Sequence, residues 1–128
     1  MKTASFFGRM VFGGFFLYNG VMHFVARKDM AKQAASKGVP YANLAVAATG
    51  AALVAGGTSI ILGLKPNLGT GAITGFLATV SPIMHNFWRY RGPKRETEMH
   101  QFTKNLALLG GAMALMGTGD SWPAKISA

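Results

Sequence analysis

Three histidines are the side chains of this 128-residue chain best suited to bind a ring-shaped ligand or to move a proton. His23 and His85 each stand near the end of an apolar stretch, and His100 stands just before another. Asn19 lies four residues before His23, and Arg89 lies four residues after His85, so each pair shares a face if its segment is helical. The sequence therefore predicts polar positions at the ends of apolar segments, where imidazole chemistry is available.

Three kinds of chemistry are open to these positions. Asn19, His23 and His85 can hydrogen-bond between helices or to interfacial water, which stabilises membrane helices by about 0.6 to 2 kcal/mol for each bond. The imidazoles can instead line a pocket for a quinone or a similar ring. Aromatic side chains would form the walls of that pocket: Phe24, Phe87, Trp88 and Tyr90. Axial ligation of a haem or chlorophyll is the third, and no histidine-pair motif favours it. We predict His23, His85, Asn19 and Trp88 as the cofactor-binding residues and expect no metal site.

The acidic residues form no catalytic constellation. Asp29, Glu96 and Glu98 lie in basic loops and Asp120 lies in the C-terminal tail, whereas a proton relay would need a carboxylate inside an apolar segment. Cysteine is absent, which excludes disulfides, thiolate metal sites and CxxC redox chemistry. We therefore expect no catalytic activity from this chain on its own.

Four apolar segments must position these residues: 6–24, 44–64, 69–88 and 102–118. Each is close to the roughly 20 residues that a membrane-spanning helix needs. Four strands are too few for a closed barrel, and an open strand leaves its backbone unpaired in lipid. We predict an all-α fold, an integral membrane four-helix bundle that forms one domain over residues 1–128. A short amphipathic helix over residues 30–37 should lie on the membrane surface between the first two spans.

The basic residues indicate how the bundle is oriented. Lys and Arg number 13 against 4 Asp and Glu, which would fit nucleic-acid binding, but they lie in short clusters between apolar segments, the pattern that membrane insertion produces. Most of them belong to one side: Arg27, Lys28, Lys32, Lys37, Arg89, Arg91, Lys94, Arg95 and Lys104. The positive-inside rule places that side in the cytoplasm, with both termini outside and the histidines near the cytoplasmic face. Arg9, one turn into the first segment, should extend to the outer interface rather than turn inward toward an anionic group.

Small residues at four-residue spacing predict close helix packing, because they let helix backbones approach each other in a membrane. One such ridge runs along the second segment: Ala47, Ala51, Ala55, Ser59 and Gly63. Gly56 and Gly75 belong to similar pairs, and we expect both to be helix contacts.

Short motifs follow one another along nearly the whole chain: Gly14-Phe-Phe-Leu-Tyr-Asn-Gly20 with His23-Phe24, Met30-Ala31, Lys37-Gly-Val-Pro40, Thr49-Gly50, Gly56-Gly57, Leu62-Gly63 and Met84-His85. In this order they resemble the DoxX family of small bacterial membrane proteins. The resemblance implies four helices, the bacterial cytoplasmic membrane and a link to quinone-dependent oxidoreductases, including a thiosulfate:quinone oxidoreductase. Many members place a Glu three residues before the Gly-Gly pair, where this chain has Leu53, so a carboxylate that could serve proton or quinone chemistry is missing.

The function that we expect is an accessory or anchoring subunit of a quinone-linked membrane electron-transfer complex. Its partners would be the lipid bilayer and other subunits of that complex, with no nucleic acid. One alternative is a quinone-interacting oxidoreductase component in its own right. A small-solute or lipid carrier is disfavoured, since no buried charge or broken helix marks a path.

Overall fold

The computed structural model describes residues 2–116, and this part of the chain is helical, with no strand. The elements are α1 (Lys2–Val25), α2 (Arg27–Ser36), α3 (Ala42–Leu62), α4 (Pro66–Met84), the 3₁₀ helix η1 (Phe87–Arg89) and α5 (Gly92–Met116). The all-α prediction is therefore confirmed, together with a short helix between the first two long ones.

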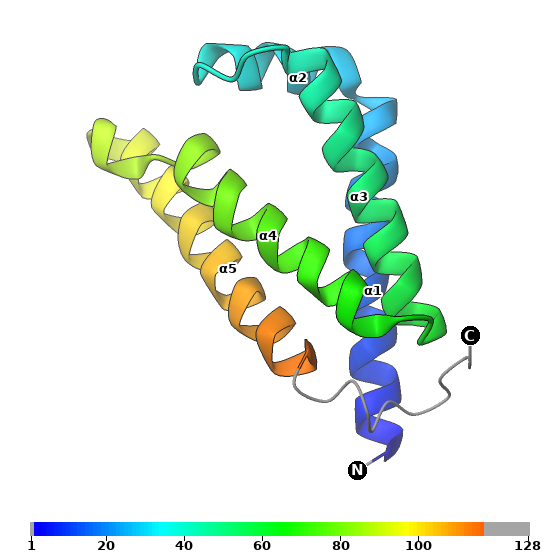
Figure 1. Ribbon diagram of the computed structural model, residues 1–128. Helices are drawn as coiled ribbons and strands as arrows, with labels where there is room; N and C mark the ends of the chain where they lie inside the picture. Colours follow the sequence, from blue (N-terminus) through cyan, green and yellow to red (C-terminus); the bar gives the residue numbers. More distant parts are fainter. Residues whose placement is uncertain (1, 117–128) are drawn as a thin grey trace.

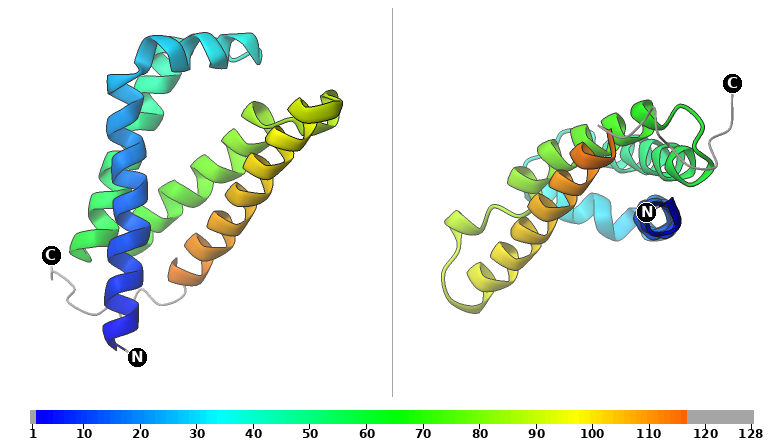
Figure 2. Two further views of the ribbon diagram at one scale, coloured as in Figure 1. Left: turned by 180° about the vertical axis from the view of Figure 1, so that it is seen from behind. Right: turned by 90° about the horizontal axis from the view of Figure 1, so that it is seen from below.

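The long helices form two antiparallel pairs that diverge like the arms of a V (Figure 1). One pair is α1 with α3, and the other is α4 with α5 (Figure 2). The narrow end holds the α3–α4 turn together with the start of α1 and the end of α5. At the wide end α2 lies across the upper end of the α1–α3 pair in the view of Figure 1, and the connection from α4 to α5 lies at the upper end of the other pair. Any ligand site between the pairs therefore lies toward the wide end.

Glycines bring α1 and α3 into backbone contact. A methyl group added at Gly57 would lie 2.6 Å from the Gly13 carbonyl oxygen, and one added at Gly20 would lie 2.7 Å from the Val54 nitrogen. These residues are not the predicted small-residue ridge, of which Ala51 and Ala55 are exposed. The ridge was misplaced because small residues occur on several faces of α3, and sequence does not fix rotation about the helix axis.

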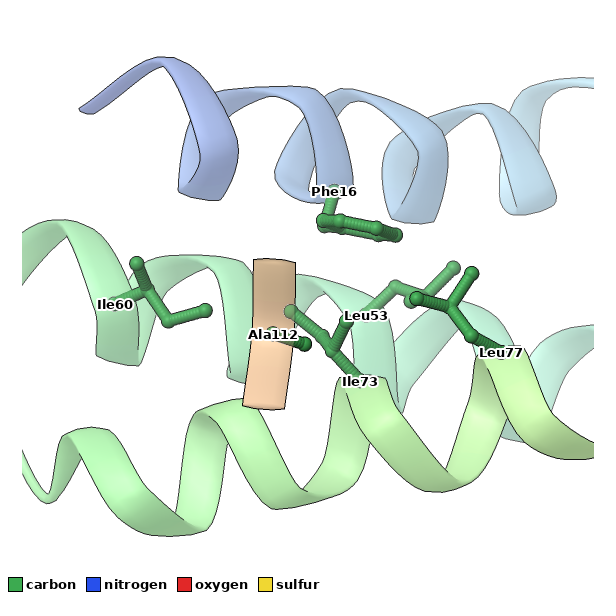
Figure 3. Packing of buried hydrophobic residues seen from close by; sticks show 6 residues of the cluster. All are labelled: Phe16, Leu53, Ile60, Ile73, Leu77 and Ala112. Atoms are coloured by element: carbon green, nitrogen blue, oxygen red, sulfur yellow. The ribbon is translucent and has the colours of Figure 1, made fainter. Parts of the chain in front are cut away.

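One apolar core joins all four long helices (Figure 3). Its buried members are Phe16 of α1, Leu53 and Ile60 of α3, Ile73 and Leu77 of α4, and Ala112 of α5. Leu53 is only 1% exposed and is part of this packing. Burying one such side chain fully contributes about 1.5 to 3 kcal/mol in an aqueous reference, which makes the narrow end the firmly held part of the molecule.

The α3–α4 turn is fixed by backbone geometry and one hydroxyl. Gly63 ends α3 with a φ of 68°, a left-handed value that suits glycine. Ser59 donates its hydroxyl proton to the carbonyl oxygen of Leu64 at 2.6 Å. Pro66 then starts α4, where its missing N–H costs no hydrogen bond. Ser59 and Gly63, predicted as packing residues, thus shape this turn.

The helix boundaries differ from the predicted segments by one to four residues at most ends, and the differences at the α4–α5 connection change which residues are helical near the site. α4 ends at Met84 instead of residue 88, because the chain turns there into η1. α5 begins at Gly92, ten residues before the predicted start, because the charged residues 92–101 continue the helix beyond its apolar part. An apolar segment marks only the portion of a helix that suits lipid, so hydropathy misses such an extension. The predicted end at residue 118 lies outside the described residues.

Within residues 2–116, α3 is the single helix both long and apolar enough to cross a membrane by length and composition. Polar side chains within α1, including Arg9 and His23, and the charged first turns of α5 lower the hydropathy of those helices. The four-span topology and its orientation therefore stay predictions.

Candidate functional site

A cleft of about 480 Å³ lies between α3 and α4 toward the wide end of the V. It falls in the range of about 300 to 1,000 Å³ that is usual for small-molecule sites. The residues that line it are mostly apolar: Met30, Gln33, Ala34 and Val39 from α2 and its turn; Ala45, Val46, Ala48, Thr49 and Ala52 from α3; Ala72, Gly75, Phe76, Thr79, Val80, Ile83 and Met84 from α4; and His23 from α1. An apolar ring or chain is the kind of ligand that this lining suits.

His23 is the one imidazole among the described residues that line the cleft, and it is only 8% exposed. Its Nδ1 lies 2.7 Å from the carbonyl oxygen of Asn19, one turn earlier in α1. A carbonyl oxygen only accepts, so Nδ1 must carry the proton. In the neutral ring Nε2 is then an acceptor. The ring also meets Phe76 edge to face, with centroids 6.0 Å apart.

Gly50 of α3 explains why His23 can sit so close to the neighbouring helix. A methyl group at Gly50 would lie 2.7 Å from the His23 Cβ and 3.0 Å from the Phe24 ring. The side chain of α1 therefore rests against bare backbone of α3. This packing fixes the imidazole in place beside the cleft.

Asn19 and Trp88 do not line the cleft. The Asn19 amide donates to the carbonyl oxygen of Phe15 at 2.8 Å, within its own helix. Trp88 is 50% exposed and packs edge to face on Phe87 and Phe102, at 5.3 and 6.0 Å between ring centroids. The aromatic walls predicted from the sequence are thus replaced by Phe76 and aliphatic side chains. Cofactor binding by Asn19 and Trp88 remains a prediction.

His85 lies outside the cleft lining, in a polar cluster that we call the wide-end cluster: Lys37, His85, Asn86, Tyr90 and Glu98. The Lys37 ammonium donates to Asn86 Oδ1 at 2.8 Å and to the Tyr90 hydroxyl at 2.7 Å. The same ammonium and His85 Nδ1 each lie 3.5 Å from Glu98 Oε2. Lys37 directly follows α2, whereas its partners follow α4 or belong to α5. The cluster therefore joins the two arms of the V where they are far apart.

The pKa values of His85 and Tyr90 in this cluster are both lowered, but for different reasons. Desolvation lowers the pKa of His85, and the Glu98 carboxylate opposes that effect without reversing it. The hydrogen bond from Lys37 lowers the pKa of the Tyr90 hydroxyl. His85 is thus held toward its neutral form, beside an ion pair of Lys37 with Glu98.

Sequence reasoning missed the partners of both histidines. The Lys37–Glu98 pair joins residues 61 positions apart, with no local signal. Phe76, the ring partner of His23, could have been suspected only weakly from the sequence, as one aromatic residue in the third apolar segment. Arg9 is 2% exposed, with its guanidinium carbon 5.3 Å from the Phe6 ring centroid, and its extension to the outer interface remains a prediction.

No group of three or more His, Asp or Glu that could hold a metal ion occurs in the described part of the chain. His23 Nε2 could serve as one axial ligand, but no second histidine of residues 2–116 lines the cleft. The arrangement therefore fits a hydrogen-bonded organic ring better than a tetrapyrrole held by two histidines.

Comparison with known proteins places this geometry in a family. A family model described as DoxX matches residues 4–86, more than half of the chain. No curated protein and no solved structure gives a match. The matched region contains α1 to α4 and the whole cleft lining, whereas α5 lies beyond it. The chain belongs to the DoxX family of small membrane proteins.

Proposed function

We propose that this protein is an accessory subunit of a quinone-linked electron-transfer complex in the bacterial cytoplasmic membrane, and that it holds a quinone-type ring in the α3–α4 cleft. The observation that carries this proposal is an apolar cleft of about 480 Å³ with a single buried imidazole, His23, in its wall. Binding sites for such ligands combine a large apolar surface with a few placed polar groups.

The chemistry of the lining supports a ring with polar substituents. The edge-to-face pairing of Phe76 with His23 provides an aromatic wall beside the imidazole. Met30 and Met84 add flexible side chains that adapt to an irregular ligand. None of the described residues that line the cleft carries a formal charge, so an ionised ligand would lose its hydration without gaining a partner.

An accessory role is supported by what the cleft lacks. No carboxylate is found among the described residues that line it. Large exposed apolar side chains cover the outer faces of α1 and α5: Phe7, Val11, Tyr18 and Val25 on α1, and Leu106 and Met113 on α5. Surfaces of this kind contact lipid or other membrane subunits. The stand-alone quinone-reacting component remains the alternative.

Filling the cleft tests the ligand part of the proposal. Gly75 lines the cleft, and a methyl group added there would meet no atom within 4 Å, so Gly75→Leu should occupy the ligand volume without disturbing the backbone. Gly110→Leu is the matched control, because Gly110 also has open space but lies on α5 outside the cleft. Binding of a short-chain ubiquinone, measured by native mass spectrometry, should weaken roughly tenfold or more only in Gly75→Leu. Equal binding by both variants would refute the cleft as the site.

Purification of the tagged protein in mild detergent tests the accessory role. Stable co-purification of larger redox subunits supports it. A protein that purifies alone, still binds the quinone and reduces or oxidises it would instead support the stand-alone component.

A further inference from the structure

We infer that the α3–α4 cleft binds the reduced, hydroxyl-bearing form of its ring ligand in preference to the oxidised form. The inference rests on the proposed function and goes beyond it by assigning the redox state that the site selects. A quinone offers carbonyl oxygens, which only accept hydrogen bonds, whereas a quinol offers two O–H donors. The question is therefore whether the polar atoms along the cleft donate or accept.

His23 presents an acceptor. Its Nδ1 lies 2.7 Å from the Asn19 carbonyl oxygen, and that bond forms only when the proton is on Nδ1. The neutral imidazole then has its lone pair on Nε2, the ring nitrogen left for a ligand. Because Asn19 O is a backbone atom held within α1, the tautomer is set by the helix itself and does not depend on a mobile partner.

The two threonines of the lining are acceptors as well. Thr49 donates its hydroxyl proton to the carbonyl oxygen of Ala45 at 2.8 Å, and Thr79 donates to that of Gly75 at 2.8 Å. Each hydroxyl has one proton, so what remains toward the cleft is oxygen lone pairs. Gln33 on α2 is the one lining side chain of the described residues with donors still available, and it is exposed, as is Thr79. The less exposed polar groups of the lining, His23 and Thr49, are therefore both acceptors.

A cleft lined by acceptors discriminates between the two forms of one ligand. A quinol hydroxyl can donate to His23 Nε2, whereas a quinone carbonyl there would face a lone pair and leave two acceptors unpaired. Leaving a buried polar group without a partner costs more than the bond itself contributes. We expect the quinol to bind about tenfold more tightly than the quinone. For a two-electron couple, a tenfold preference raises the midpoint potential of the bound ligand by about 30 mV.

The experiment compares three ligands that share ring and tail. Wild-type protein in detergent is titrated with a short-chain ubiquinone, with its quinol under anaerobic reducing conditions, and with the dimethyl ether of that quinol. The ether keeps the ring but has no O–H, so it should bind as weakly as the quinone. Equal or tighter binding of the quinone overturns the inference while leaving the proposed function intact. Failure of all three ligands to bind would refute the proposed function itself.

Two further measurements separate the tautomer from general effects on the fold. His23→Phe keeps an aromatic ring and removes the imidazole acceptor, so the preference for quinol should fall severalfold; His100→Phe, at an exposed position on α5, should leave it unchanged. If His23→Phe does not fold, the ¹⁵N NMR spectrum of wild-type protein with labelled histidine still shows which ring nitrogen of His23 carries the proton. A protonated Nδ1 and a bare Nε2 for His23 support the inference, and the opposite tautomer overturns it.

Discussion

Replacement of Gly57 by alanine should separate α1 from α3, because the added methyl group would meet backbone and not a flexible side chain. That methyl would lie 2.6 Å from the Gly13 carbonyl oxygen and 2.7 Å from the Leu17 nitrogen. To reach an ordinary contact of about 3.4 Å, the two helices must move apart by about 0.8 Å. Overpacking of this kind typically costs about 1 to 3 kcal/mol.

Gly14→Ala is the matched control for this prediction. A methyl group at Gly14 meets nothing within 4 Å, so the change should be neutral or should stabilise α1 by up to about 1 kcal/mol through helix propensity. The free energy of unfolding of both variants can be measured by reversible SDS titration in mixed micelles, followed by circular dichroism. The reasoning is refuted if Gly57→Ala is as stable as Gly14→Ala, since the close α1–α3 contact would then not exist.

Four further predictions concern the wide end. Glu98→Gln should lower the pKa of His85 further, measured by NMR, because the carboxylate is the group that opposes desolvation. Since burial already lowers the pKa of His85, the unfolded state takes up its proton first as the pH falls below about 6.5, so stability should decline there and be highest above it. Lys37→Met should broaden the distance distribution between spin labels on cysteines at positions 36 and 91, because it removes the bonds that join the arms; the chain has no native cysteine to interfere. A reporter fused at Arg91 should show a cytoplasmic location, and an external one would overturn the orientation.

The positions of the helices were the feature of the structure that the sequence predicted best. Apolar segments near 20 residues long located all four long helices, and the stop at Gly38 and Pro40 located the short one. The charged start of α5 was missed, because hydropathy reports where a helix suits lipid and not where its hydrogen bonds begin. The V shape was missed for a different reason, since it depends on how side chains pack.

Helix rotation decided which site residues could be predicted. His23 lines the cleft and His85 does not, and which of the two would do so depended on an angle about each helix axis that no spacing reveals. Cofactor binding by either histidine stays a prediction. His85 instead lies with Glu98, a residue that looked like an ordinary loop charge. Gly56 and Gly75 were both predicted to be helix contacts. Gly56 is a helix contact, because a methyl group added there would lie 3.1 Å from the Gly69 carbonyl oxygen, whereas Gly75 faces the cleft.

The two ends of the molecule differ in how much apolar surface and how many polar bonds hold them, and this bears on how a ligand would enter. The narrow end is closed by an apolar core to which all four long helices contribute, and in it Leu53 and Ile60 are at most 1% exposed. At the wide end Lys37 bonds to polar partners at distances of 2.7 to 3.5 Å, beside a small apolar cluster in which Met84 of α4 packs against Ala31, Ala34 and Val46 of α2 and α3. Polar contacts of this kind exchange readily for bonds to water or headgroups, whereas separating the core would expose packed apolar surface. Opening of the cleft should therefore pivot about the narrow end, with Lys37 releasing first and His23 staying fixed against Gly50.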